Sequence, residues 1–174
     1  MNFAELSDLA VEMTVIWVID SSALIDFKMI VPIGEQWEFF RTLDDLVDNS
    51  MIAMPRQVIR EVGEITHPDV PGAWASSVRK RMVHPLDVDY QVLGMVMETA
   101  GDVVDASKDE EDADPYVLAL ALQLQSIGYE VRVVTSDVVD RIPIRISLET
   151  ACHRMSVRTL SPEDFVVAIR AESP

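Results

Sequence analysis

The stretch Val15-Ile-Trp-Val-Ile-Asp20 decides the fold, because five consecutive apolar residues end on a carboxylate. A short apolar run of this kind is typical of a strand that is buried on both faces of a parallel sheet. Helix-compatible residues begin at Ser22, so the acid lies where a strand passes into a helix. Ligands bind at the carboxyl ends of the strands in open parallel sheets. Asp20 is therefore the first candidate site residue.

The rest of the chain alternates apolar runs with amphipathic segments, which predicts a three-layer α/β/α fold around a central, mostly parallel sheet. We expect further strands at residues 51–54, 130–135 and 157–160. Helices are expected at residues 36–47, 57–62, 73–81, 88–104, 116–125 and 148–155, and from residue 161 onward. Helical spacing places Trp37, Phe40, Leu43 and Val47 on one side of their helix, and Val92, Met95 and Val96 on one side of theirs. We expect both sides to face the core.

The length of 174 residues fits one domain, which we expect over residues 15–174. Residues 1–14 form an acidic amphipathic stub, either an extra helix or a segment that precedes a natural start at Met13.

No apolar segment reaches the roughly 18 residues that span a bilayer, and the N-terminus lacks the pattern of a signal peptide. Cys152 is alone, and we expect it to be a small buried side chain. We therefore expect a cytoplasmic protein that contacts no membrane.

A net charge of −16 argues against tight, unassisted binding to nucleic acid, since phosphate contacts normally need a basic face. Local basic groups remain. Arg79, Lys80 and Arg81 form the densest cluster, and Arg56 and Arg60 lie close to Glu61 in the sequence. Four further arginines lie toward the C-terminus, and we expect them on solvated surfaces: Arg141, Arg145, Arg154 and Arg158.

Three more acids occupy positions similar to that of Asp20. Asp137 follows the second clear strand, Glu61 lies in the first turns of a helix that follows a strand, and Asp114 opens the most apolar helix of the chain. Strand ends and helix N-termini of this kind lie on one side of a doubly wound sheet. Crowded carboxylates repel one another unless a cation joins them, and oxygen ligands suit Mg²⁺ or Mn²⁺. Such an ion activates water, and the chemistry most consistent with the site is phosphodiester hydrolysis.

Each acid also has a simpler interpretation. Asp114 precedes Pro115 and would serve equally as a helix N-cap. Asp112, two residues earlier, is the alternative ligand or a solvated loop residue. Glu61 could be a surface residue paired with a neighbouring arginine, and Thr135 could merely bond to its own turn.

Four segments together resemble PIN domains, the nuclease fold of the VapC-type toxins of toxin–antitoxin pairs. The segments are Val18-Ile-Asp-Ser-Ser-Ala-Leu-Ile-Asp-Phe27, the stretch Pro55…Val58…Glu61, Asp112-Ala-Asp-Pro-Tyr-Val-Leu-Ala-Leu-Ala121 and Val133-Val-Thr-Ser-Asp137. They occur in the family's order, and the resemblance extends from Val15 to about Leu160. The third segment and the Ile-Pro after the last acid look most like a less characterised VapC-like branch.

The resemblance implies a PIN-like, Rossmann-type fold and a Mg²⁺- or Mn²⁺-dependent endoribonuclease. It implies that Asp20, Glu61, Asp114 and Asp137 hold one or two ions. Ser22 would orient Asp20 or a water molecule, and Thr135 would line the wall of the site. Arg56, Arg60, Arg79, Lys80 and Arg81 are the candidates for binding the RNA backbone. The implied partners are the RNA substrate, a cognate antitoxin protein and a second copy in a homodimer.

Two other classes of function are weighed against the nuclease. A PIN-like fold that serves only as a binding module agrees with the charge of −16, whereas the four acids argue for catalysis. An aspartyl-phosphate phosphatase would need a second aspartate where Ser22 stands. A phospho-receiver would need an acid pair before its phosphorylated aspartate and a lysine after a late strand, and neither pattern is present.

Overall fold

The computed structural model describes residues 14–64, 68–109 and 111–171. The sheet contains β2 (Ile52–Ala53), β1 (Val15–Ile19), β3 (Glu130–Val134) and β4 (Arg158–Leu160), in that spatial order. All three strand pairs are parallel. The predicted strands are thus present, and the sheet is parallel as expected.

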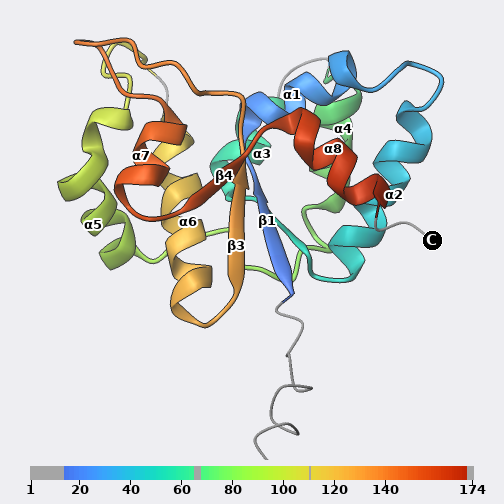
Figure 1. Ribbon diagram of the computed structural model, residues 1–174, viewed down its shortest axis with the longest axis horizontal. Coiled ribbons are helices and arrows are strands. Elements are labelled where there is room, and N and C mark those ends of the chain that lie inside the picture. The colour runs from blue at the N-terminus through green and yellow to red at the C-terminus, as the bar shows by residue number, and fades with distance from the viewer. Residues whose placement is uncertain (1–13, 65–67, 110, 172–174) are drawn as a thin grey trace, which may run out of the picture.

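Helices cover both faces of the sheet. They are α1 (Ser21–Ile30), α2 (Gln36–Asp48), α3 (Arg56–Gly63), α4 (Val70–Val78), α5 (Tyr90–Ala100), α6 (Asp114–Ser126), α7 (Leu148–Arg154) and α8 (Pro162–Ala171), with a 3-10 turn η1 (Gly101–Val103) after α5. Figure 1 shows α5, α6 and α7 on one side of the sheet and α1, α2, α4 and α8 on the other. The predicted three-layer α/β/α fold is confirmed.

The strand order has its switch point at the neighbouring strands β1 and β3. From β1 the chain moves to β2 on one side, and it later returns to β3 on the other side. Such a switch in direction opens a crevice at the carboxyl ends of the two central strands. Ile19 pairs with Val134, and the backbone N–H of Asp20 donates to the Val134 carbonyl at 3.0 Å. Asp20 and Thr135 therefore leave the sheet side by side.

The core lies on both sides of β1 and around α6. Trp17 of β1 meets the ring of Phe165 from α8 edge-on at 5.3 Å, and both side chains are buried. Leu118, Ala119 and Leu120 are consecutive in α6 and all fully buried. A helix that buries consecutive residues is enclosed on all sides. This confirms the central position expected for the most apolar helix.

Two predicted core residues point outward. Trp37 is 78% exposed. The side of α2 that faces the core contains Phe39 instead, and its ring packs on that of Phe27 with 5.0 Å between the centroids. Phe40, Leu43 and Val47 are buried as predicted. On α5, Val96 is buried and Val92 packs partly against the core, whereas Met95 is exposed.

Some element boundaries differ from the prediction. Helix α4 starts at Val70, earlier than expected, because the Asp69 carboxylate caps it by accepting from Gly72 N at 3.2 Å. It ends at Val78, so the basic cluster 79–81 follows the helix instead of lying on it. The predicted helix 88–104 is α5 followed by η1. The prediction for the stub falls almost entirely on residues 1–13, which lie outside the described residues.

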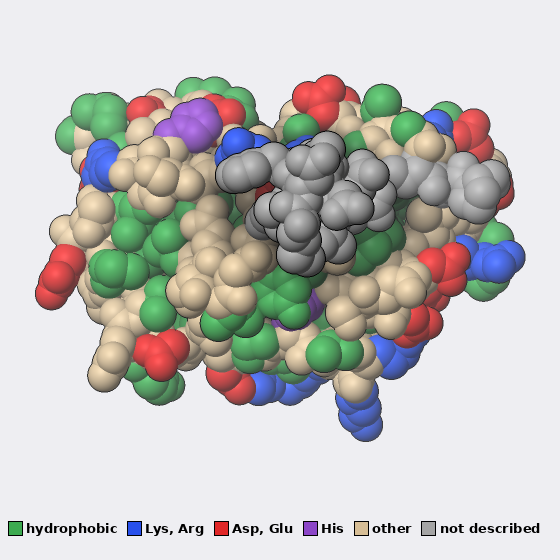
Figure 2. Space-filling model, turned by 60° about the horizontal axis from the view of Figure 1, so that its bottom comes forward, with side chains coloured by type: hydrophobic (Ala, Val, Ile, Leu, Met, Phe, Trp, Pro, Cys, Tyr) green, Lys and Arg blue, Asp and Glu red, His purple; other side chains and the backbone are tan. Residues whose placement is uncertain are grey.

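The described helices include none that is long and apolar enough to cross a membrane. Figure 2 views the end of the molecule opposite the carboxyl ends of the strands, and acidic and basic side chains alternate around its visible rim. Cys152 is fully buried in α7, as expected. Burial raises the pKa of its thiol, which keeps it protonated and unreactive.

Candidate active site

Asp20 lies at the start of α1 with its carboxylate almost completely buried, at 2% exposure. Its Oδ1 accepts from Ser21 N at 2.7 Å. Its Oδ2 accepts from the Ser22 hydroxyl at 2.5 Å and from the Thr135 hydroxyl at 3.0 Å. Burial raises the pKa of Asp20, although these hydrogen bonds act in the opposite direction. The carboxylate is thus held in one orientation by donors that carry no charge.

Ser22 and Thr135 connect the ends of β1 and β3. The Ser22 oxygen accepts from Ser136 N at 3.1 Å and lies 3.3 Å from the Thr135 hydroxyl oxygen. Thr135 also accepts from Asp137 N at 3.0 Å. Thr135 therefore does both things that its sequence position suggested, since it bonds to its own turn and contacts Asp20. Ser22 lies where it orients Asp20, as the resemblance implies.

Glu61 reaches Asp20 from α3, although it lies in the second half of that helix and not in its first turns. Its Oε2 accepts a short hydrogen bond from the Ser21 hydroxyl, and its Oε1 accepts from Ala113 N at 3.1 Å. Burial raises the pKa of Glu61, these two bonds oppose the rise, and the charge of Asp20 adds to it. Glu61 is exposed at the surface, as the simpler interpretation held, but its carboxylate bonds to Ser21 and Ala113, and no arginine pairs with it among the described residues.

Asp114 and Asp137 meet at a cation, Arg145. The Arg145 Nη1 lies 2.7 Å from Asp114 Oδ2, and its Nη2 lies 2.9 Å from Asp137 Oδ1. Asp137 Oδ2 also accepts from Leu148 N at 2.8 Å. Asp114 is the first residue of α6, and Ala113 occupies the N-cap position, so the N-cap interpretation of Asp114 is wrong.

The carboxyl group of Asp114 faces an excess of negative charge. Burial and the nearby charges of Asp20 and Asp112 raise the pKa of Asp114 to about 8, while Arg145 lowers it. One guanidinium therefore does not balance the acids that surround Asp114. The causes of the shift also place Asp114 near Asp20 as well as near Asp137.

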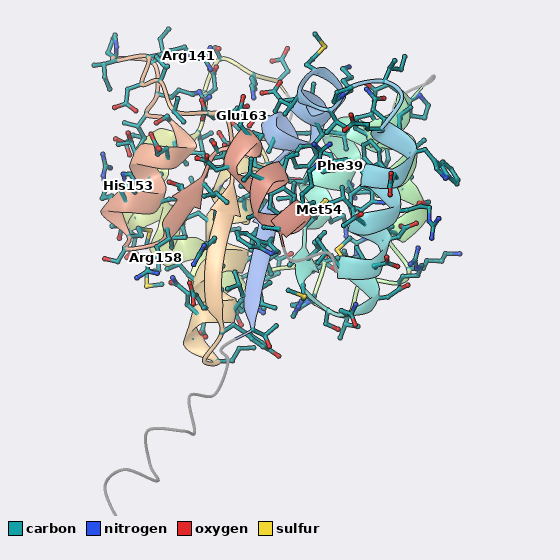
Figure 3. The ribbon with its side chains drawn as sticks, turned by 45° about the vertical axis from the view of Figure 1, so that its right-hand side comes forward. Phe39, Met54, Arg141, His153, Arg158 and Glu163 are labelled. Carbon is teal, nitrogen blue, oxygen red and sulfur yellow. The ribbon has the colours of Figure 1, made fainter. Side chains whose placement is uncertain are left out.

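Arg145 was expected on a solvated surface, and that prediction is wrong, because its residue exposure is 8%. The three other C-terminal arginines are exposed as predicted, and Figure 3 shows Arg141 at the outer end of the loop that follows β3 and Arg158 at the outer side of β4. The available signal was local: Arg145 lies between Ile144 and Ile146, in a segment otherwise apolar. Buried arginine needs paired carboxylates, and Asp114 and Asp137 supply them.

Asp112 is also buried, at 6% exposure, so it is not a solvated loop residue. Its Oδ2 accepts from Asp105 N at 3.1 Å, and its Oδ1 lies 3.5 Å from Lys108 Nζ. These contacts hold the loop that precedes α6. Its charge contributes to the raised pKa values of both Asp114 and Glu61. Asp112 thus belongs to the same cluster of acids.

Four of the five candidate RNA-binding residues are paired with carboxylates. Arg56 forms a bidentate pair with Asp87, Arg60 lies near Glu64 and Glu111, Arg79 lies near Glu64, and Arg81 contacts Asp44 and Asp48. Lys80 is exposed. Trp74 is buried and donates from its indole nitrogen to Asp44, so this side chain belongs to the core. The role of the five basic residues in RNA binding stays a prediction.

The acid cluster fits a hard divalent cation in its donor atoms and in its uncompensated charge. Within the described residues, however, no three His, Cys, Asp or Glu side chains are grouped tightly enough to hold a metal ion. The carboxylate oxygens of Asp20 and Glu61 accept from serine, threonine and backbone donors instead. A cation would compete with these neutral donors on the Asp20 side, and with Arg145 on the Asp137 side.

A cavity of about 320 Å³ is lined in part by Asp112, whereas Asp20, Glu61, Asp114 and Asp137 do not line it. Its other walls include Leu93, Met97, Pro115 and Tyr116. Apolar walls and an aromatic ring are the surfaces on which unpaired bases stack.

Comparison with protein families gives a match over residues 17–172 to a family described as a domain of unknown function (DUF4411). The matched region includes all four acids and Arg145. No curated protein matches this sequence.

Proposed function

Because the chain belongs to the DUF4411 family, whose description states no activity, we propose a function from the site itself: a Mg²⁺- or Mn²⁺-dependent endoribonuclease, the toxin of a toxin–antitoxin pair. The observation that carries this proposal is the raised pKa of Asp114, together with that of Asp20, at the switch point of a parallel sheet. Asp20 has only neutral donors, and Asp114 shares a single guanidinium with Asp137, so the cluster carries an excess of negative charge that a divalent ion would balance.

Asp20, Glu61 and Asp114 are the residues that would hold the ion. When bound, it would activate water and stabilise charge on the phosphodiester. Ser22 and Thr135 act on Asp20, because they hold its Oδ2 in place and connect it to β3. Ser21 acts in the same way on Glu61. These neutral donors fix the two acids without neutralising them.

The cavity beside Asp112 supports a nucleic-acid substrate. Tyr116, Pro115 and Met97 offer a surface on which a base next to the scissile phosphate would stack. The basic residues are mostly paired, so the ion would have to provide most of the attraction for phosphate. We therefore expect RNA binding to depend on the metal.

The protein partners and the cellular location rest on the PIN resemblance. We propose a cognate antitoxin, a homodimer and a cytoplasmic site of action. Buried Cys152 agrees with a reducing compartment.

A catalytically silent binding module is the second candidate, and a specific observation favours it. Arg145 already neutralises part of the acid cluster, and no three potential ligands group tightly among the described side chains. A phosphatase of the aspartyl-phosphate type gains no support, because Ser22 stands at its second acid position and bonds to Asp20.

Cleavage of a panel of total RNA and single-stranded oligonucleotides tests the proposal. Cutting in Mn²⁺ should occur with the native chain and disappear in Asp20→Asn. Asp45→Asn, an exposed acid on α2, is the matched control and should cut normally. Equal cutting by Asp20→Asn would show that the nuclease is a contaminant. Absence of both cutting and Mn²⁺ binding in the native chain would favour the binding module.

A further inference from the structure

Arg145 divides the acid cluster into two unlike halves. One half, Asp114 and Asp137, shares a buried guanidinium, with one Nη on each carboxylate at 2.7 and 2.9 Å. The other half, Asp20 and Glu61, is contacted by the neutral donors of Ser21, Ser22, Thr135 and the Ala113 backbone. Only the first half contains its own positive charge.

The backbone holds Arg145 in place. Arg141 N donates to the Arg145 carbonyl at 2.9 Å, and Arg145 N donates to the Arg141 carbonyl at 3.1 Å. Ile146 N donates to the Asp102 carbonyl at 2.9 Å, which ties the same segment to η1. The guanidinium therefore enters the cluster from a segment that is fixed on both sides.

Among the described residues, Arg145 has no partner comparable to these two carboxylates. Apart from the two carboxylates, its Nη1 faces only the carbonyls of Val103 and Ile146, at 3.4 and 3.5 Å, and its Nε is buried without a hydrogen-bond partner among the described residues. A cation that took Asp114 and Asp137 from it would leave a buried charge unpaired. Such a cation would also be repelled by the guanidinium at close range.

We infer that Arg145 stands in for a second metal ion, so that the chain binds one divalent ion, on the Asp20 side, and Asp137 is a partner of Arg145 rather than a metal ligand. This inference rests on the proposed function, because it concerns the same site. It makes Arg145 a positioning residue, which sets the places of Asp114 and Asp137 relative to the ion. It also departs from the ligand set that the resemblance implies.

The number of bound Mn²⁺ ions tests the inference without reference to activity. Calorimetric titration of the full chain after removal of metal with EDTA should give one ion for the native protein and for Arg145→Lys. Arg145→Gln should give two, because Asp114 and Asp137 are then free. Asp137→Asn, which keeps the shape of the side chain, should still bind one ion with affinity within about threefold of native. Asp20→Asn should bind none at the native affinity.

Each other outcome has a distinct meaning. Two ions in the native chain, or loss of the ion in Asp137→Asn, would overturn the inference and leave the nuclease proposal standing. A single ion in folded Arg145→Gln would also overturn it, since Arg145 would then not occupy a metal position. No ion in the native chain would defeat the proposed function itself. If Arg145→Gln fails to fold, the counts in the native chain and in Asp137→Asn still decide.

Discussion

At the scale of single residues, the acids of the site interact with other segments of the chain more than with the helices that contain them. Asp114 opens a helix without capping it, and Glu61 bonds to Ser21 of α1 and Ala113 beside α6. Their pKa values are raised first because burial disfavours the charged form, and then because other carboxylates lie nearby. The site therefore holds stored repulsion that a cation would relieve.

The first residue-scale prediction concerns pH. The pKa of Asp114 is raised from 3.8 to about 8. Between these two values the folded state keeps a proton that the unfolded state has already lost. The free energy of unfolding should therefore fall as the pH rises from 5 to 8 in EDTA. Urea titrations measure this. Asp114→Asn should flatten the dependence, and saturating Mn²⁺ should reduce it, because the ion binds the deprotonated form. A stability that rises over the same range would contradict the environment found for Asp114.

The second concerns the buried ion pairs. Arg145→Ala leaves Asp114 and Asp137 without their shared cation and should lower the free energy of unfolding by about 3–5 kcal/mol in EDTA. Arg154→Ala is the control, since its pair with Asp102 is exposed and its loss should change stability by at most about 1 kcal/mol. Equal effects of the two substitutions in chemical denaturation would show that Arg145 is not buried in solution.

At the scale of elements, the position of Glu61 depends on how closely α3 packs on α4. A Cβ at Gly72 would lie 2.1 Å from the Val62 carbonyl oxygen, and a Cβ at Gly63 would lie 2.3 Å from Ser76 Oγ. The absence of side chains at both glycines thus lets the two backbones approach. Glu61 precedes Val62 directly, so this contact also sets where the carboxylate stands.

The element-scale prediction follows from that contact. Gly72→Ala should force α3 and α4 apart, lower stability by about 1–3 kcal/mol and weaken Mn²⁺ binding through Glu61. Gly94→Ala is the matched control, because nothing lies within 4 Å of its Cβ on exposed α5, and it should be neutral or stabilise by up to about 1 kcal/mol. Thermal melting with and without Mn²⁺ compares the two. Native metal binding by a destabilised Gly72→Ala would show that Glu61 does not depend on this packing.

At the scale of the whole molecule, the net charge of −16 reflects an excess of acids, and many of these acids pair with the basic residues. Arg56, Arg60, Arg79 and Arg81 all face acids, as described above. A polyanion such as RNA meets few free cations on this surface.

The whole-molecule prediction is that RNA binds poorly without metal. In EDTA, a single-stranded oligonucleotide should bind with a Kd weaker than about 10⁻⁴ M by fluorescence anisotropy. The double substitution Glu64→Gln and Asp87→Asn releases Arg56 and Arg79 from their partners and leaves Arg60 with Glu111 alone, and it should tighten binding. Glu38→Gln with Asp45→Asn makes the same change of charge on α2 and is the control. Equal tightening by both pairs would mean that net charge alone matters and that the arginines near Glu61 form no RNA-binding surface.

The sequence by itself determined the layered fold and the place of the acids. The apolar run of β1 and the three valines of β3, with an acid or a hydroxyl directly after each strand, are local patterns that have the same consequence in any parallel sheet. The strands and the order of the helices therefore followed from the chain alone, whereas the bond from Thr135 to Asp20 was not predicted. The prediction for Trp37 was wrong because helical spacing allows either Trp37 or Phe39 to lie on the inner side of α2. In the fold Phe39 lies there, packed on Phe27.

Only the tertiary structure decided the charge balance of the site. Arg145 resembles any loop arginine in the sequence, and its burial arises because Asp114 and Asp137, distant along the chain, approach it from two sides. The partners of Glu61 and the close approach of α3 to α4 are likewise properties of packing. Local pattern specifies which residues reach an edge of a sheet, whereas the energy of each charge there depends on which other charges the fold brings beside it.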